Sequence, residues 1–223
     1  MKVIILAGGR GTRLLHSAKD VPKALVPIRG KTILDHQLDL LKKHGLTDVC
    51  LSLGFRADQI VDHLKKTGRE GIEYVIESEP LGTGGAVRFA AKGLKDDFMV
   101  LNGDLISDFD FTEILRLHQP ATPLVVAAWR EDARDFGLLG IVNDKIRAFL
   151  EKPQTLRPGF INAGCYILNP KHLEDVKEKA FMLEKDVFPR LVQEGELRTH
   201  VHLGFWQDVG TEERLAEIRN QVE

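Results

Sequence analysis

The most constraining feature of this 223-residue chain is an alternation in its first half between short apolar runs and amphipathic stretches. The apolar runs cover residues 3–7, 49–53, 72–76 and 98–102, and the amphipathic stretches cover 32–45, 57–68 and 83–94. Strands that alternate with helices in this way are typical of βαβ units around a parallel sheet. The alternation therefore predicts an α/β fold with a doubly wound, mixed but mainly parallel sheet.

The stretch 32–45 indicates how the helices of such a fold would pack. Ile33, Leu34, Leu38 and Leu41 fall on one helical face, and Gly45 follows as a residue that ends helices. Connections between parallel strands are almost always right-handed, so the loops that follow the strands gather at one edge of the sheet. Open α/β sheets bind their ligands at that edge. We therefore expect the functional residues in those loops.

The chain beyond residue 120 has a different pattern, with more strand-like segments. These segments cover residues 123–129, 138–143, 145–152 and 160–168, with Asn143-Asp144 as a hairpin turn between the middle two. Helical patterns return over 173–180 and 184–195, a strand-like run covers 198–210, and Thr211 is placed to cap a closing helix. Because a single core can grow to roughly 250 residues, we expect one domain over 1–223, with halves at 1–119 and 120–223.

Composition excludes several classes of protein. A formal net charge of −2 gives no basic surface for binding nucleic acid by counterion release. Cys50 and Cys165 lie in apolar runs without the spacing of a zinc site or a disulfide framework, so both are expected to be buried thiols. The apolar run near Met1 is too short for a signal peptide or a membrane span. The sequence therefore predicts a cytoplasmic protein with neither nucleic-acid nor membrane partners.

The segment 6–14, LAGGRGTRL, is the most informative motif. An apolar run leads directly into Gly8, Gly9 and Gly11, which are interleaved with Arg10 and Arg13. Glycines let backbone N–H groups approach phosphate oxygens closely, and the arginines can offset the charge of a triphosphate. The loop is neither a Walker A loop nor a complete dinucleotide fingerprint. A plain strand-to-helix turn is the alternative, but two arginines among three glycines favour phosphate binding.

A second cation follows in DVPKALVPI, residues 20–28. Pro22 restricts the backbone of the residue before it and stiffens the loop that presents Lys23. Lys23 is therefore a candidate for a second phosphate contact. A Pro-Lys pair alone is most often a surface turn, so the weight of this interpretation comes from its nearness to the glycine loop.

Two aspartates are candidates for a metal site. The run VLNGD ends an apolar strand on Asp104, which places a carboxylate at the ligand edge of the sheet. Asp208, in FWQDVGT, follows a second strand-like run and precedes Gly210. Mg²⁺ is commonly held by one or two carboxylates together with phosphate oxygens. The alternative is that each aspartate only caps a turn or a helix.

The segment EPLGTGGAV, residues 79–87, places three glycines ahead of a predicted helix. Gly82, Gly84 and Gly85 would leave room for a flat nucleobase, and Thr83 is available as a helix cap and a side-chain donor. A helix start softened by glycines is the alternative.

Taken together, these motifs resemble those of a known family. The combination G-G-x-G-T-R-L followed by x-P-K is the signature of the sugar-phosphate nucleotidyltransferases, which are similar to this chain over its whole length. The resemblance implies a Rossmann-like nucleotidyltransferase fold with a β-rich sugar-binding lid. The segments 20–28 and 79–87 are most similar to those of the heptose and mannose 1-phosphate guanylyltransferases of that family.

The resemblance also implies a role for each matching position. Arg13, Lys23, Asp104 and Asp208 would be catalytic, with the two aspartates holding Mg²⁺. The sugar phosphate would be bound by Gly137, Glu151, Lys152 and Asn162. The nucleotide would be bound by Leu6, Ala7, Gly8, Gly9, Gly11, Thr12, Arg13, Lys23, Glu79, Gly82, Thr83, Gly84, Asn102 and Gly103.

The expected reaction is an in-line displacement in which an oxygen of a sugar 1-phosphate attacks the α-phosphorus of a nucleoside triphosphate and pyrophosphate leaves. No histidine is assigned a role. GTP and a manno-heptose or mannose 1-phosphate are the first choice of substrates. Many relatives have Arg-Pro-Leu-Thr after the glycine loop, whereas this chain has Leu15-His16-Ser17-Ala18. This difference bears on the nucleobase contacts.

Three alternatives stay open on the sequence. A uridylyl- or thymidylyltransferase acting on N-acetylmuramate or a hexose 1-phosphate would share the reaction. A non-catalytic sensor of nucleotide-sugars would be favoured by loss of Asp104 or Asp208, but both are present. A dinucleotide-dependent oxidoreductase is disfavoured because the third glycine of its fingerprint is missing. The sequence leaves the oligomeric state undetermined.

Overall fold

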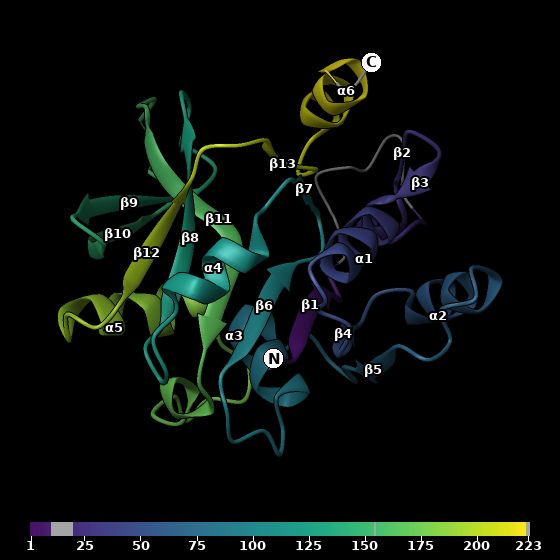
Figure 1. Cartoon of the computed structure of the whole chain (residues 1–223), viewed down its shortest axis with the longest axis horizontal. Helices are drawn as coiled ribbons and strands as arrows, with labels where there is room; N and C mark the ends of the chain where they lie inside the picture. Colours follow the sequence, from purple (N-terminus) through teal and green to yellow (C-terminus); the bar gives the residue numbers. More distant parts are fainter. Residues whose placement is uncertain (10–19, 154, 222–223) are drawn as a thin grey trace.

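A computed structural model describes residues 1–9, 20–153 and 155–221 of the chain (Figure 1). The strands are β1 Val3–Ala7, β2 Pro27–Ile28, β3 Lys31–Thr32, β4 Val49–Leu53, β5 Glu73–Ile76, β6 Phe98–Asn102, β7 Leu105–Ser107, β8 Leu124–Arg130, β9 Gly137–Val142, β10 Lys145–Glu151, β11 Gly159–Leu168, β12 Arg198–His202 and β13 Trp206–Asp208. The helices are α1 Ile33–Lys43, α2 Ala57–Lys66, α3 Gly82–Ala90, α4 Phe111–Leu117, α5 Phe188–Gln193 and α6 Glu212–Gln221. Short 3₁₀ turns are η1 Lys23–Leu25 and η2 Pro170–Leu173, and η3 Leu183–Val187 is a π turn.

A nine-stranded sheet runs through the molecule in the order β5-β4-β1-β6-β11-β8-β12-β10-β9. Its first four strands are parallel, as the βαβ alternation predicts. Strand β11 pairs antiparallel with both β6 and β8, and an additional pairing of β11 with β9 curls the second half of the sheet back on itself. The predicted α/β fold with a mixed sheet is confirmed. Two small ladders, β7–β13 and β2–β3, stand apart from this sheet.

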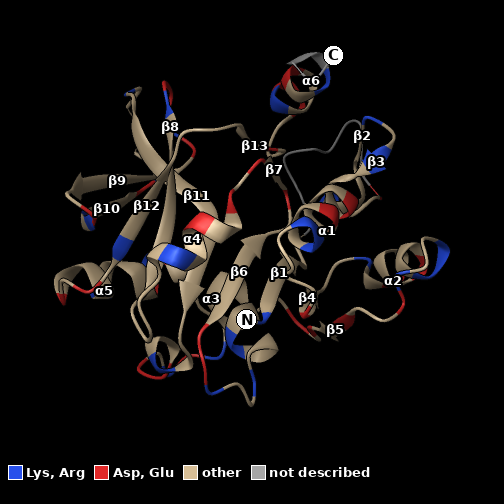
Figure 2. Cartoon of the chain, viewed as in Figure 1, with Lys and Arg blue, Asp and Glu red and all other residues tan. Residues whose placement is uncertain are grey.

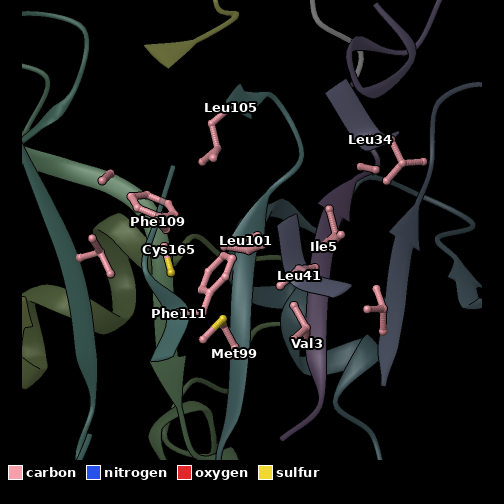
Figure 3. Packing of buried hydrophobic residues seen from close by; sticks show 14 of the residues in the cluster. Val3, Ile5, Leu34, Leu41, Met99, Leu101, Leu105, Phe109, Phe111 and Cys165 are labelled. Atoms are coloured by element: carbon pink, nitrogen blue, oxygen red, sulfur yellow. The ribbon is translucent and has the colours of Figure 1, made fainter. Parts of the chain in front are cut away.

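Helices cover both faces of the sheet, which confirms the doubly wound prediction. Helices α1, α2 and α4 contribute to one apolar cluster, in which Figure 3 shows Leu41 of α1 beside Val3 and Ile5 of β1. Helices α3 and α5 contribute to a second cluster on the opposite face, and α3 lies behind β6 in Figure 1. Successive strand residues point to opposite faces, so β1 serves both clusters. Each fully buried Leu or Ile contributes roughly 1.5–3 kcal/mol to stability.

Local signals place several element ends where the sequence predicts them. Gly45 follows α1 with a φ of +73°, and Asn143 turns the β9–β10 hairpin with a φ of +57°. Thr211 Oγ1 accepts the Arg214 N–H at 3.3 Å at the start of α6, as predicted for a cap. The helix predicted over 173–180 is not formed, because the η2 turn ends at Leu173 and the following residues pack on the start of α3 instead.

Charge and polarity agree with the predicted classes. Figure 2 shows acidic and basic residues interspersed along the outer helices α1 and α2. Cys50 and Cys165 are both free and buried, as predicted, and burial raises the pKa of each thiol. Within the described ranges, none of the helices has the length and apolar character needed to cross a membrane.

Candidate active site at the carboxyl edge of the sheet

A cleft of about 580 Å³ opens where β1 and β6 end and α3 begins. This is the edge at which the sequence predicts the ligand site. Predicted residues that line it are Leu6, Ala7, Gly8, Gly9, Lys23, Glu79, Gly82, Thr83, Asn102, Gly103 and Asp104. Gly11, Thr12 and Arg13 lie outside the described residues. The cleft therefore brings together predicted residues from four separate segments of the chain.

Close backbone approach explains why the strand ends carry glycine. A Cβ on Gly103 would lie 2.5 Å from the Leu6 carbonyl oxygen, and the Gly103 N–H donates to that same oxygen at 3.0 Å. The ends of β1 and β6 are thus pressed together beneath the cleft. On the other side of β1, a Cβ on Gly54 would lie 2.8 Å from the Gly8 carbonyl oxygen. Any side chain at Gly54 or Gly103 would force these strand ends apart.

Lys23 and Asp104 form the charged centre of the cleft. Lys23 Nζ lies 3.0 Å from Asp104 Oδ2, and the two side chains are 17% and 33% exposed. Pro22, at the N-cap of the η1 turn that contains Lys23, has an extended backbone with φ −55° and ψ 138°. Lys23 thus forms a partly buried ion pair with Asp104 in the cleft.

Asp208 is brought beside Asp104 by the small β7–β13 ladder. Asp208 pairs with Leu105 in that ladder, and the Val209 N–H donates to the Asp104 carbonyl oxygen at 2.7 Å. Asp208 Oδ2 accepts from Arg214 Nη1 at 3.0 Å, while Asp208 Oδ1 is buried and finds no hydrogen-bond partner among the described residues. Such an orphaned oxygen is costly unless something else binds it.

The electrostatics around Asp208 fit a cation. Burial raises the pKa of Asp208, Arg214 and Lys23 lower it, and the negative charge of Asp104 adds to the rise, with a net increase. Two neighbouring carboxylates, one with an unsatisfied oxygen, are a donor set suited to a hard divalent ion. No cluster of three or more His, Cys, Asp or Glu side chains with metal-site geometry occurs in the described part of the chain.

The glycine-rich start of α3 differs from the prediction. Cβ atoms on Gly84 and Gly85 would lie 2.2 Å from the Phe181 ring and 2.6 Å from the Lys179 carbonyl oxygen. The space that these glycines leave is therefore filled by the segment 179–182 and is not open to a purine. Gly82, with a φ of +71°, does line the cleft.

Thr83 and Glu79 also take other partners than expected. Thr83 is not the helix cap, because its hydroxyl donates to Glu184 Oε2 at 2.6 Å and accepts the Leu183 N–H at 2.9 Å. Leu81 occupies the cap position without a side-chain bond. Glu79 is exposed and forms an ion pair with Lys179.

Two acidic residues near the cleft are absent from the sequence-based prediction. Glu77 lines the cleft, where its Oε2 accepts the Leu81 N–H and its Oε1 accepts the Ser52 hydroxyl, each at 3.2 Å. Glu184 is partly buried beside Thr83, and burial raises its pKa, which the charge of Glu151 raises further. The position of Glu77 directly after β5 is a signal that could have identified it, whereas nothing local marks Glu184.

The residues predicted to bind the sugar phosphate come together on the curled part of the sheet. Gly137 of β9 pairs with Glu151 of β10, and Ile161, next to Asn162, pairs with Leu138 of β9. Lys152 Nζ lies 3.3 Å from Glu151 Oε1. The three strands thus place Gly137, Glu151 and Asn162 close to one another, in a group that does not line the cleft itself.

Backbone and hydrogen-bond contacts fix this second group. The Lys152 N–H donates to the Phe136 carbonyl oxygen at 3.0 Å, and Lys152 has a left-handed backbone with a φ of +49°. Asn162 Nδ2 donates to the Tyr166 hydroxyl at 2.9 Å. A non-glycine residue keeps a left-handed backbone only where its surroundings hold it, so the contacts around Lys152 fix its position.

Glycines at closely approaching strand ends, a lysine and two neighbouring carboxylates thus lie together at the edge where open α/β sheets bind ligands. The profile of the Nucleotidyl transferase family matches residues 2–223. The chain belongs to that family.

Individual relatives sharpen this assignment. The chain is 39% identical to mannose-1-phosphate guanyltransferase 2 of Candida glabrata, an alignment that covers 94% of this chain and 61% of that protein. It is 38% identical to the mannose-1-phosphate guanyltransferase of Saccharomyces cerevisiae, with the same coverage of 94% and 61%. This chain thus spans about three fifths of the length of these curated relatives.

Solved structures are similar over nearly the whole chain. HddC from Yersinia pseudotuberculosis, complexed with GMP-PN, superposes with a TM-score of 0.87 at 31% identity, covering 100% of this chain and 99% of that one. A putative glucose-1-phosphate thymidylyltransferase from Bacillus anthracis, in complex with a sucrose, also has a TM-score of 0.87, at 25% identity, with 99% and 94% coverage.

Proposed function

We propose that this protein transfers a nucleoside monophosphate from a nucleoside triphosphate to a sugar 1-phosphate, forming a nucleotide-sugar and pyrophosphate. The observation that carries the proposal is the charged centre of the cleft, where Lys23 lies 3.0 Å from Asp104 and the neighbouring Asp208 has a buried oxygen without a partner among the described residues. Such a site suits a reaction that needs positioning and charge stabilisation.

The chemistry is an in-line displacement. An oxygen of the acceptor phosphate forms a bond to the α-phosphorus, and the bond from that phosphorus to the bridging oxygen of the β-phosphate breaks. Pyrophosphate leaves on the opposite side with the bonding electron pair. The attacking phosphate is ionised at neutral pH, so no general base is required. Lys23 would exchange Asp104 for an α-phosphate oxygen and hold it as negative charge builds. Arg13 would share this task.

We further propose Mg²⁺ as the cofactor, held by Asp104 and Asp208. When bound, the ion would neutralise triphosphate charge and orient the α-phosphorus. The unpartnered Oδ1 of Asp208 supports this assignment, because a bound cation would relieve both the missing contact and the raised pKa.

GTP is the proposed donor, and mannose 1-phosphate or a manno-heptose 1-phosphate is the proposed acceptor. The support is the similarity to proteins named mannose-1-phosphate guanyltransferase and to HddC bound to GMP-PN. The space for a purine would come from the cleft beside Gly82, since Gly84 and Gly85 are covered by the segment 179–182. Glu77 and Glu79 both line the cleft, and a carboxylate there would accept hydrogen bonds from the guanine N1–H and 2-amino group. The cytoplasmic location stays a prediction.

A panel assay tests the function and the donor together. Pyrophosphate release is measured with GTP, UTP, dTTP and CTP at equal concentration, each against mannose, manno-heptose, glucose and N-acetylmuramate 1-phosphates. We expect kcat/KM to favour GTP by about tenfold to a hundredfold, since an unpaired buried polar group costs roughly 1–3 kcal/mol. A higher kcat/KM with UTP or dTTP would refute the donor but not the reaction, whereas no release with any pair would refute the reaction itself.

A further inference from the structure

One arginine contacts both the proposed metal site and the acceptor side. Arg214 lies in the first turn of α6 with a side chain only 15% exposed. Its Nη1 lies 3.0 Å from Asp208 Oδ2, its Nη2 lies 2.6 Å from Asp135 Oδ2, and its guanidinium carbon lies 4.4 Å from the centre of the Phe136 ring. We propose that Arg214 is a positioning residue that ties Asp208 to the acceptor loop, defined here as residues 135–137. This inference rests on the proposed function.

The contact with Asp208 is built into the backbone. A Cβ on Gly210 would lie 2.4 Å from Asp208 Oδ2 and 3.1 Å from Arg214 Nη1, so only glycine leaves room for this ion pair. Because Arg214 takes Oδ2, the rotation of the carboxylate is fixed and Oδ1 keeps its buried position without a partner from the described residues. The arginine therefore determines which carboxylate oxygen is offered to a cation.

The contact with the acceptor loop reaches the predicted sugar-phosphate residues. Phe136 contacts both the Arg214 guanidinium and the Trp206 side chain. The ring centres of Phe136 and Trp206 lie 5.5 Å apart, with an angle of 71° between the ring planes. The Phe136 carbonyl oxygen accepts the Lys152 N–H at 3.0 Å, and the next residue, Gly137, pairs with Glu151. Loss of the guanidinium would therefore loosen the backbone to which Lys152 is attached.

Arginine is the residue type that this arrangement requires. Its planar guanidinium presents donors in a fixed fork and stacks on aromatic rings, so it can hold two carboxylates and a ring face at once. Lysine is a point charge on a flexible stem and lacks the planar fork that can stack on the Phe136 ring while it reaches both carboxylates. Replacement of Arg214 by Lys should therefore fail to restore the wild-type geometry.

A second arginine on the same ring supplies a matched control. The Arg130 guanidinium lies 6.0 Å from the Phe136 ring centre and donates to Gln207 Oε1 at 2.8 Å. It forms no ion pair with a carboxylate within the described residues. Arg130→Gln thus removes a cation from the same aromatic ring without releasing Asp208 or Asp135.

The test compares Arg214→Gln, Arg214→Lys, Asp135→Asn and Arg130→Gln in the full chain, with GTP and mannose 1-phosphate as substrates. We expect both Arg214 variants to raise the KM for mannose 1-phosphate about tenfold and to lower kcat, with the KM for GTP changed less than threefold. Asp135→Asn should raise the acceptor KM but leave kcat within about threefold, because Asp208 keeps its partner. Arg130→Gln should leave the acceptor KM within about twofold.

Calorimetric binding of mannose 1-phosphate in the absence of nucleotide gives a readout that is independent of turnover. Weaker binding by the Arg214 and Asp135 variants, but not by Arg130→Gln, would support the inference. Normal acceptor affinity in Arg214→Lys, or an equal rise in both KM values, would overturn it. If Arg214→Gln does not fold, Asp135→Asn decides the acceptor half alone. A wild type that is inactive across the panel overturns the proposed function, whereas an active wild type with normal Arg214 variants overturns only this inference.

Discussion

The two halves of the molecule assemble their site residues by different means. In the nucleotide half, β1 and β6 are parallel neighbours in which Leu6 pairs with Asn102, so the loops that follow them meet at one edge. In the acceptor half, Gly137, Glu151 and Asn162 are gathered by antiparallel pairing and by the curl that joins β11 to β9. Loops after parallel strands form a site wherever the strands are adjacent, but residues inside antiparallel strands meet only if the register is known. The nucleotide half is therefore readable from sequence motifs and the acceptor half is not.

The largest loss of activity is expected from substitutions at the point where the two halves meet. Asp104 follows β6 in the first half and Asp208 ends β13 in the second. Asp104→Asn and Asp208→Asn should each remain folded but lower kcat at least a hundredfold, because each removes a charged oxygen from the proposed metal site. Pyrophosphate release and circular dichroism would be measured on the same samples.

Asp62→Asn is a suitable control for that pair, because Asp62 is an exposed carboxylate on α2 far from the cleft. It should keep wild-type turnover. Near-normal turnover in either folded Asp104 or Asp208 variant would contradict the metal assignment. It would also show that turnover does not require a carboxylate from each half.

A weaker effect, confined to the nucleotide half, is expected at Lys23. Lys23→Ala should lower kcat about tenfold to a hundredfold and change the KM for the sugar 1-phosphate less than threefold, since an α-phosphate contact strengthens as charge develops. Lys23→Arg, which keeps the charge near Asp104, should recover part of kcat. The measurement is steady-state kinetics at saturating donor. A variant that lost only acceptor affinity would place Lys23 on the other ligand.

The smallest effect tests the packing between the halves. Gly84→Ala would put a methyl group 2.2 Å from the buried Phe181 ring, so we expect a loss of about 1–3 kcal/mol in the free energy of unfolding. Gly71→Ala is the control, because a Cβ there meets nothing within 4 Å and should change stability by less than about 0.5 kcal/mol. Urea titration of both variants measures the difference. Equal stability of the two variants would show that the segment 179–182 shifts at little cost in free energy to accommodate a methyl group at position 84.

The sequence predicts those features that are encoded within a few residues. The parallel strands, the Asn143-Asp144 hairpin and the Thr211 cap each depend on local patterns, and each is confirmed. Helix α4 is missing from the prediction, although Asp110 Oδ1 accepts the Glu113 N–H at its start. Its short apolar pattern between two turns gave too little periodicity to be recognised.

The other errors lie where segments distant in the sequence contact one another. The sequence predicts Thr83 as a helix cap, but its hydroxyl forms hydrogen bonds with Glu184 and Leu183, about a hundred residues away in the chain. Likewise, the helix predicted over 173–180 is not formed, and the end of this segment packs against Gly85 instead. Tertiary contacts can override weak local propensities. The link from Arg214 to Asp208 and Asp135 likewise has no signature in the sequence.

The small β7–β13 ladder has a consequence for how the protein becomes active during synthesis. It joins residues 105–107 to residues 206–208, so the second carboxylate can reach the first only after about a hundred further residues have been added. A ribosome-bound chain that stops before Trp206 has Asp104 but not Asp208. It therefore lacks one of the two carboxylates of the proposed metal site until the last segment is synthesised.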